Sequence, residues 1–181
     1  MRDKCILPFL ITERLEFFQL TQADLPELEI LLGDTEIMYA WEHGFTKIES
    51  QAWLNENLRR YSSDGYSYWA VRKKNDGSLI GVMGILKEVA EGKQYIGIGY
   101  ILNKKYWGQG YAGEGTEALC QYAFRKLQLQ TLTAQVRTNN FASQHIAEGL
   151  GMKAMCNFVK IYRGQEMPHF LYTLDRDKWL K

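Results

Sequence analysis

The chain has 181 residues, of which 46% are hydrophobic and 24% charged, with 3 prolines. This composition is typical of one folded domain over residues 1–181 and excludes a disordered or low-complexity chain. The net charge of +1 lacks the basic excess of a nucleic-acid-binding protein. The longest apolar stretch, near Ile96–Leu102, is far shorter than the ~20 residues of a membrane helix. We expect a soluble protein without nucleic-acid or membrane partners.

Cysteine is sparse, and its spacing excludes two classes of site. Cys5, Cys120 and Cys156 are too few and too far apart for a disulfide framework or a zinc site, so no metal is expected. Reduced thiols fit a cytoplasmic protein, and each cysteine is predicted to pack as a small core hydrophobe.

Charge is distributed unevenly along the chain. Residues 1–60 carry 6 Lys and Arg against 11 Asp and Glu, whereas residues 61–181 carry 16 against 10. This difference is compatible with chance scatter over solvated surfaces. It is equally compatible with a C-terminal part that binds an anion and an N-terminal part that tolerates a cation.

Hydrophobic periodicity predicts two helices and four strands in the first 102 residues. A strand over 12–20 is followed by a capping box, Thr21 to Asp24, that opens a helix ending at Gly33. A second box, Thr46 to Glu49, opens a helix that ends within 62–65. Strands over 66–72, 79–86 and 95–102, joined by short Gly-containing turns, predict an antiparallel meander.

The rest of the chain alternates helices and strands. We expect a helix over 113–127, a strand over 131–137, and a short helix that Asn140 caps and Gly151 ends. Two last strands are predicted over 154–162 and 169–174. Together these elements indicate a mixed α+β domain.

A glycine-rich turn, Trp107-Gly108-Gln109-Gly110-Tyr111-Ala112, connects the strand at Tyr100–Leu102 to the following helix. The first amides of a helix have no intrahelical partner and the helix dipole is positive there, so the turn can bind a phosphate. Gly108-x-Gly110-x-x-Gly113 also matches a dinucleotide fingerprint literally. The preceding antiparallel meander, and a next strand without Asp or Glu, disfavour that interpretation. A turn without any ligand stays open as an alternative.

At this point the sequence resembles a known family. The order of elements, the 107–112 turn and the segment Asn140-Phe-Ala-Ser143 with Gly149-Leu-Gly-Met152 resemble the GNAT superfamily of acetyl-CoA-dependent N-acetyltransferases. Thr12-Glu-Arg-Leu15 and Ile98-Gly-Tyr100 are similar to its Rim-type branch of ribosomal-protein N-terminal acetyltransferases. The resemblance extends from about Leu10 to Trp179. It implies a GNAT-like α+β fold with a mixed, mostly antiparallel central sheet flanked by helices.

The same resemblance implies a cosubstrate, acetyl-CoA, and the residues that contact it. The main chain of Tyr100, Ile101 and Leu102 would pair with pantetheine, and Asn140 and Ser143 would contact the cofactor arm. The amides of the turn would hold the pyrophosphate: Gly108, Gln109, Gly110, Tyr111 and Ala112. Trp107 would pack its side chain beside them. Ser143 would protonate the departing thiolate, or it would only bond the backbone or the cofactor at the start of its helix. Apart from the resemblance, Tyr162 is another candidate donor, or a half-buried packing residue of its strand.

Two residues depart from the family pattern. The Rim-type branch often has a Glu, a possible base acting through water, where this chain has Gly97. Other branches have a Tyr that protonates the thiolate where this chain has Ala147. Glu42 and His43, between the two N-terminal helices, are candidate proton acceptors or ordinary loop residues.

Releasing a thiolate at pH 7 costs about 2 kcal/mol, so an acid is helpful but dispensable. Neutralising an α-amine costs about 1.4 kcal/mol, against about 4.6 for a lysine.

We therefore expect an acetyl-CoA-dependent N-acetyltransferase that works by direct attack of an amine. A protein or peptide N-terminal α-amine, or a small amine of low pKa, is favoured as the acceptor. A catalytically silent acetyl-CoA-binding protein is the alternative. The oligomeric state is left open, a homodimer included.

Overall fold

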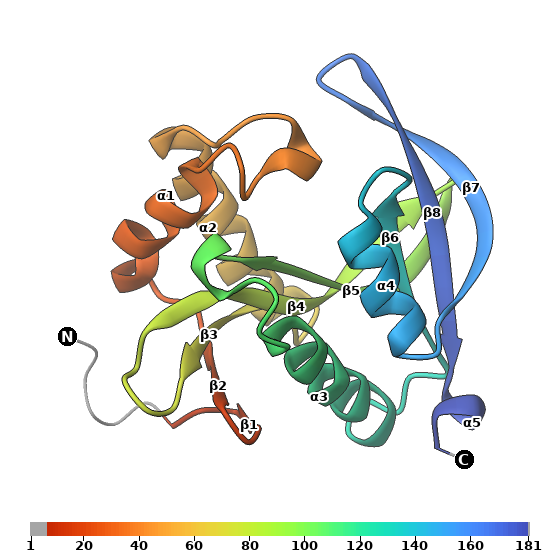
Figure 1. Cartoon of the computed structure of the whole chain (residues 1–181), viewed down its shortest axis with the longest axis horizontal. Coiled ribbons are helices and arrows are strands. Elements are labelled where there is room, and N and C mark those ends of the chain that lie inside the picture. The colour runs from red at the N-terminus through yellow and green to blue at the C-terminus, as the bar shows by residue number, and fades with distance from the viewer. Residues whose placement is uncertain (1–6, 181) are drawn as a thin grey trace. The chain divides into compact units, whose positions relative to one another are not determined.

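The computed structural model describes residues 7–180, which form two compact units (Figure 1). The first unit contains residues 7–84 and 100–115, and the second contains 85–99 and 116–180. Cys5 lies outside the described residues. Across residues 7–180, no helix combines the length and the apolar character needed to cross a membrane. The expectation of one domain over the whole chain stays a prediction.

The first unit contains an antiparallel sheet and two long helices. Its strands pair in chain order, each antiparallel to the next. They are β1 (Leu10–Ile11), β2 (Leu15–Gln19), β3 (Tyr68–Lys73) and the first half of β4 (Leu79–Ala90). The helices are α1 (Leu25–Gly33) and α2 (Lys47–Ser63), which pack together, and the first turn of α3 (Tyr111–Arg125). Three short 3-10 helices complete the unit: η1 (Gln22–Asp24), η2 (Tyr39–Trp41) and η3 (Lys104–Tyr106).

Both predicted capping boxes form, and they set where the chain becomes helical. At α2, the Thr46 hydroxyl accepts a hydrogen bond from the Glu49 amide, and the Glu49 side chain accepts one from the Thr46 amide. The box at Thr21 opens η1, and α1 follows it. The strand predicted over 12–20 is shorter than expected because the Thr12 amide donates to the Leu15 carbonyl, which closes a turn at that point.

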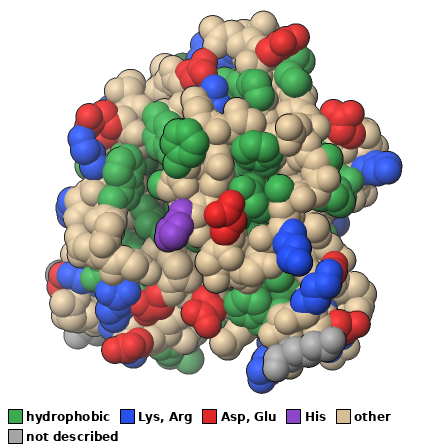
Figure 2. Space-filling model, turned by 45° about the vertical axis from the view of Figure 1, so that its right-hand side comes forward, with side chains coloured by type: hydrophobic (Ala, Val, Ile, Leu, Met, Phe, Trp, Pro, Cys, Tyr) green, Lys and Arg blue, Asp and Glu red, His purple; other side chains and the backbone are tan. Residues whose placement is uncertain are grey.

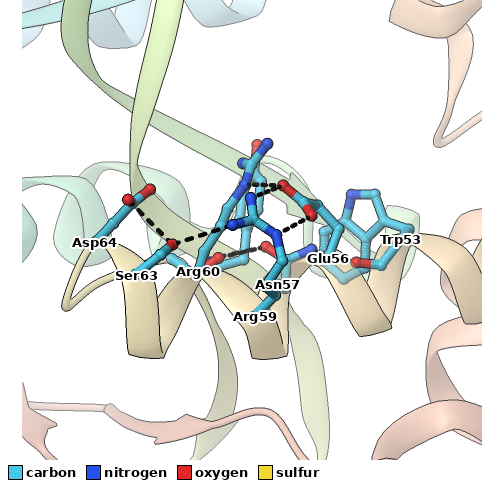
Figure 3. A network of polar contacts seen from close by, with 9 residues as sticks. Trp53, Glu56, Asn57, Arg59, Arg60, Ser63 and Asp64 are labelled. Atoms are coloured by element: carbon cyan, nitrogen blue, oxygen red, sulfur yellow. Dashed lines mark hydrogen bonds and ion pairs between the residues drawn. The ribbon is translucent and has the colours of Figure 1, made fainter.

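A buried amide anchors α2 to the start of β3. Asn57 is buried, its Oδ1 accepts from the Ser67 hydroxyl at 2.6 Å, and its Nδ2 donates to the Trp53 carbonyl at 2.7 Å (Figure 3). The preceding residue of the same helix, Glu56, binds Arg59 and Arg60, which lie one turn further along. The hydrogen bond from Arg59 is the largest of the effects that lower the pKa of Glu56, to about 2.

The second unit contains a mixed sheet and the remaining helices. Its strands lie in the order β4, β5 (Lys93–Leu102), β6 (Thr131–Arg137), β8 (Gln165–Asp175) and β7 (Lys153–Tyr162). β5 pairs parallel with β6 at Gly97 and Thr133, whereas β8 is antiparallel to both of its neighbours. The helices are the rest of α3, α4 (Phe141–Gly149) and the unpredicted α5 (Arg176–Trp179). The predicted fold class, α+β with a mixed, mostly antiparallel sheet flanked by helices, is confirmed.

The two cysteines in the second unit differ in environment. Cys120 is fully buried in α3, as predicted, and burial raises the pKa of its thiol to about 12. Cys156 is exposed, so its predicted burial is wrong. The reason is that β7 is the last strand of the sheet and most of its residues are exposed.

Acidic and basic side chains are interspersed over the face of the protein drawn in Figure 2. Ion pairs also form within the first unit, where Lys104 contacts Glu36 at 2.5 Å and Arg72 contacts both Asp24 and Glu27. The uneven charge of the two sequence regions is therefore partly neutralised by local ion pairs.

Replacing the buried amide tests its role in the first unit. Asn57→Ala leaves the Ser67 hydroxyl without its acceptor, so we expect the free energy of unfolding to fall by about 1–3 kcal/mol. Asn55→Ala, an exposed asparagine on the same helix, should change it by no more than about 0.5 kcal/mol. Urea denaturation of the three proteins measures both effects. Equal losses in the two variants would contradict an anchoring role for Asn57.

Candidate cofactor site

The glycine-rich turn has the backbone conformation that its sequence suggests. Gly108 and Gly110 have φ angles of 71° and 80°, a region that L side chains rarely adopt. α3 then begins at Tyr111, and the Glu114 amide donates to the Gly110 carbonyl at 3.0 Å. A Cβ placed on Gly108 would meet no atom within 4 Å, so the main chain there is open to approach.

Four consecutive amides of this turn are available to a ligand. Within residues 7–180, the N–H groups of Gly108, Gln109, Gly110 and Tyr111 donate no hydrogen bond. They lie at the N-terminus of a 15-residue helix, whose dipole places about half a positive charge there. The geometry therefore fits an anion such as a phosphate or pyrophosphate.

Arg14 and Glu114 hold the turn against the start of β2. The Glu114 carboxylate accepts from the Thr12 hydroxyl, from the Arg14 amide at 2.9 Å and from Arg14 Nε at 2.6 Å. Arg14 Nη1 also donates to the Gln109 carbonyl at 3.0 Å. Partial burial opposes ionisation of Glu114, but the hydrogen bonds from Thr12 and Arg14 lower its pKa below the ordinary value. One carboxylate thus fixes the first helical turn to a strand about 100 residues earlier.

Two buried tyrosines bracket the turn. The rings of Tyr106 and Tyr111 lie edge to face with their centroids 6.0 Å apart, and the Arg14 guanidinium lies 4.3 Å from the centre of the Tyr111 ring. Because both residues that flank the turn are packed, the conformation of the four residues between them is restrained before any ligand binds.

The end of β5 lies beside this turn in the first unit. The Trp107 indole donates to the Leu102 carbonyl at 2.9 Å, and its side chain is 42% exposed. The predicted packing of Trp107 is therefore only partial. On its other side, β5 approaches β4 closely, because a Cβ on Gly81 would lie 2.1 Å from the Ile101 carbonyl oxygen. The structure thus brings the predicted residues 100–102 and 107–112 together.

Asn140 and Ser143 belong to the second unit, at the start of α4. The Asn140 side chain accepts from the Ser143 amide at 3.0 Å, which is the predicted helix cap. Asn140 is buried, whereas Ser143 is partly exposed. Tyr162, the other candidate acid, is the last residue of β7, and Ala147 is buried inside α4.

The proposed loop bases take part in local structure. His43 Nδ1 lies 3.1 Å from the Trp41 carbonyl and Nε2 lies 3.3 Å from Glu49 Oε1, in the first unit. Glu42 has a φ of 61° and ends η2. His43 therefore ties this loop to the start of α2.

Sequence reasoning missed the groups that support the turn. Arg14 and Thr12 belong to the segment that is similar to the Rim-type branch, but this similarity gives them no role. No sequence pattern points to Tyr106. The one local signal was Glu114 itself, an acidic residue in the first turn of a helix. That signal indicates a carboxylate near a helix N-terminus, but it does not identify the distant strand to which the carboxylate binds.

The support for the turn has a predicted pH dependence. Because the pKa of Glu114 is lowered on folding, its contribution is present above the unfolded pKa, near 4.5, and is lost as pH falls through the folded value. Glu114→Gln should lower the free energy of unfolding by about 1 kcal/mol at pH 7. The difference from wild type should shrink steadily below pH 4.5. Denaturation midpoints at several pH values test this, and a difference that grows on acidification would contradict it.

Comparisons with known proteins agree with this geometry. Residues 14–153 match the acetyltransferase (GNAT) domain family. The chain is 30% identical to the uncharacterized protein YkkB of Bacillus subtilis, over 90% of this chain and 93% of that one. Its fold is similar to that of a Vibrio cholerae spermidine N-acetyltransferase in complex with CoA and spermine, with a TM-score of 0.77, 17% identity, and 94% and 100% of the two chains covered. It is also similar to RimL, a ribosomal L7/L12 alpha-N-protein acetyltransferase in complex with CoA, with a TM-score of 0.76, 18% identity, and 94% and 97% covered. The predicted acetyltransferase is thus confirmed: the chain belongs to the GNAT acetyltransferase family.

Proposed function

We propose that this acetyltransferase uses acetyl-CoA to acetylate a peptide or protein N-terminal amine, or a small amine of low pKa. The observation that carries the proposal is the turn at 108–111, whose amides have no partner within residues 7–180 and whose main chain is open at Gly108. Such a turn fits the pyrophosphate of coenzyme A. Membership of the family supplies the reaction class.

Each predicted site residue has a role in this proposal. When bound, acetyl-CoA supplies an acetyl group activated as a thioester. The amides of Gly108 to Ala112 hold its pyrophosphate, and the main chain of Tyr100, Ile101 and Leu102 aligns its pantetheine arm. Trp107 fixes the end of that strand through its bond to the Leu102 carbonyl. Asn140 and Ser143 contact the cofactor from the start of α4.

The proposed reaction is direct transfer without an acyl-enzyme. A main-chain amide of the strand 100–102 stabilises the oxyanion that forms at the thioester carbonyl. The Ser143 hydroxyl donates a proton to the departing sulfur, and Tyr162 is the alternative donor. A nucleophilic cysteine is not required, and the high pKa of buried Cys120 makes that thiol unsuited to the task.

The choice of acceptor rests on the cost of neutralising the amine. The two similar structures are named as a spermidine N-acetyltransferase and a ribosomal-protein alpha-N-acetyltransferase, and both share this fold. An α-amine needs about 3 kcal/mol less than a lysine side chain to become neutral at pH 7. That difference favours the N-terminal acceptor, as does the likeness of Thr12–Leu15 and Ile98–Tyr100 to the Rim-type branch. A cytoplasmic location belongs to the same proposal, because the sparse cysteines fit a reducing compartment.

Ligand-dependent stability tests the cofactor assignment. A ligand present at 100 times its dissociation constant adds about 2.7 kcal/mol of stability, so acetyl-CoA and free CoA should both raise the melting temperature. Gly110→Val should abolish that response, since its φ of 80° and the Arg14 guanidinium 3.4 Å from the new Cβ disturb the turn. Gly164→Val is the matched control, because Gly164 has a φ of 78° in the turn between β7 and β8. It should strain the fold equally and keep the response to CoA.

Three other results would contradict the proposal in different ways. Stabilisation by NADH or NADPH alone would favour the literal dinucleotide fingerprint. No response to either form of coenzyme A would remove the cofactor assignment. Stabilisation by acetyl-CoA without acetylation of any amine would favour the silent binding protein.

A further inference from the structure

A carboxylate fills the space above the glycine that replaces the family's strand glutamate. A Cβ built on Gly97 would lie 2.2 Å from Glu88 Oε2, 3.1 Å from Glu88 Cδ and 3.3 Å from the Thr133 hydroxyl. Glu88 lies on β4, the neighbouring strand, and its Oε2 is buried. Any side chain at position 97 would therefore displace this carboxylate. The position of the Glu88 carboxylate thus depends on a glycine at position 97.

The carboxylate lies on a bare strip of β5. Side chains alternate along a strand, so Gly97, Gly99 and Ile101 share one face. The first two of these positions have no side chain, which leaves the main chain beside Glu88 uncovered by its own strand. The strip runs along β5 toward residues 100–102, which the proposed function assigns to the pantetheine arm.

This face of the second unit carries buried polar side chains beside a small apolar cluster of Ala90, Phe158 and Leu171. Thr133, Arg137 and His169 are all buried and lie on it, because Thr133 pairs with Gly97 and Arg137 pairs with His169. α4 covers the opposite face, where Glu148 accepts a hydrogen bond from Tyr172. A few buried polar side chains beside apolar ones are typical of a ligand site.

Other titratable or charged groups lie on this face by strand alternation and come from every strand packed around Glu88. They are Lys93 and Tyr95 on β5, Arg137 on β6, Lys153, Cys156, Lys160 and Tyr162 on β7, and His169 and Asp175 on β8. Burial is the largest effect on His169 and lowers its pKa, and Lys160 and Arg137 add to that shift. His169 is therefore held neutral near pH 7. The other carboxylate on this face, that of Asp175 at the end of β8, accepts a hydrogen bond from Lys178 at 2.6 Å.

We propose that Glu88 receives the acceptor ammonium and takes its proton, directly or through a water. This role rests on the proposed function. The ammonium gives one proton to the carboxylate, and the neutral nitrogen then bonds to the acetyl carbon as the carbon–sulfur bond breaks. The sulfur leaves with the electron pair and takes a proton from the Ser143 hydroxyl. The second nitrogen-bound proton then replaces the one that Ser143 gave, which leaves the amide and the free thiol. Glu88 on β4 thus supplies the carboxylate that Gly97 on β5 does not have. Its negative charge favours cationic over anionic acceptors.

A pH profile separates this role from a merely structural one. Initial rates for wild type, Glu88→Gln and Glu88→Asp are measured from pH 6 to 10, with a lysine-free peptide bearing a free N-terminus and with spermidine as acceptors. We expect Glu88→Gln to lower kcat/KM by about 100-fold at pH 7. The deficit should shrink as pH approaches the pKa of the acceptor, because solvent then supplies the neutral amine. Glu88→Asp, which keeps the charge, should recover part of the rate.

Two controls make the outcome decisive. Glu117→Gln removes an exposed carboxylate from α3 and should leave the profile unchanged. The shift of melting temperature by CoA should be the same in wild type and Glu88→Gln, which shows that fold and cofactor binding are intact. If Glu88→Gln does not fold, Glu88→Asp decides, and a wild-type rate and pH profile in that variant would overturn the role.

The results also distinguish this inference from the proposed function. A wild-type protein that acetylates an amine, together with a Glu88→Gln variant of equal rate and profile, would overturn the role of Glu88 alone. A wild-type protein that acetylates neither acceptor nor any other amine would overturn the proposed function and this role with it.

Discussion

The candidate site depends on one carboxylate, that of Glu114, which is bound at once by Thr12 and Arg14. These contacts join the first turn of α3 to the start of β2 and leave Arg14 free to hold the Gln109 carbonyl as well. The Gln109 carbonyl is thereby engaged by the protein, while within residues 7–180 the amides of Gly108 to Tyr111 donate no hydrogen bond. A phosphate-binding turn needs this asymmetry, because acceptors directed at an anion would repel it.

Glycine acts in three different ways in this fold. At Gly108 and Gly110 it permits positive φ angles that point successive amides outward. At Gly81 it permits close approach of β4 to the end of β5. At Gly97 it leaves room for a carboxylate from the next strand. The first use serves the cofactor, the second shapes the strand that leads to the turn, and the third concerns the acceptor.

Local signals predicted much of the fold, and non-local contacts explain what was missed. The strand Thr131–Arg137 and the cap from Asn140 to Ser143 follow from short-range pattern and were predicted as observed. The start of β8 was predicted less accurately, at His169 and not at Gln165, because β7 and β8 form a hairpin whose register is set by their mutual pairing. Arg14, Tyr106 and Glu88 escaped prediction for the same reason. Each acts on a segment that the sequence does not place beside it.

The central claim is that the amides of the 108–111 turn bind CoA, and NMR signals of these amides can test it directly. The protein has 16 glycines, so selective 15N-glycine labelling gives a small set of amide signals, in which Gly108 and Gly110 are assigned by single substitution. On titration with CoA we predict that these two signals shift together and saturate with the binding curve, while glycines such as Gly65 and Gly164 stay in place. Saturable CoA binding that leaves Gly108 and Gly110 unmoved would contradict the account, because the cofactor would then be held by some other part of the chain.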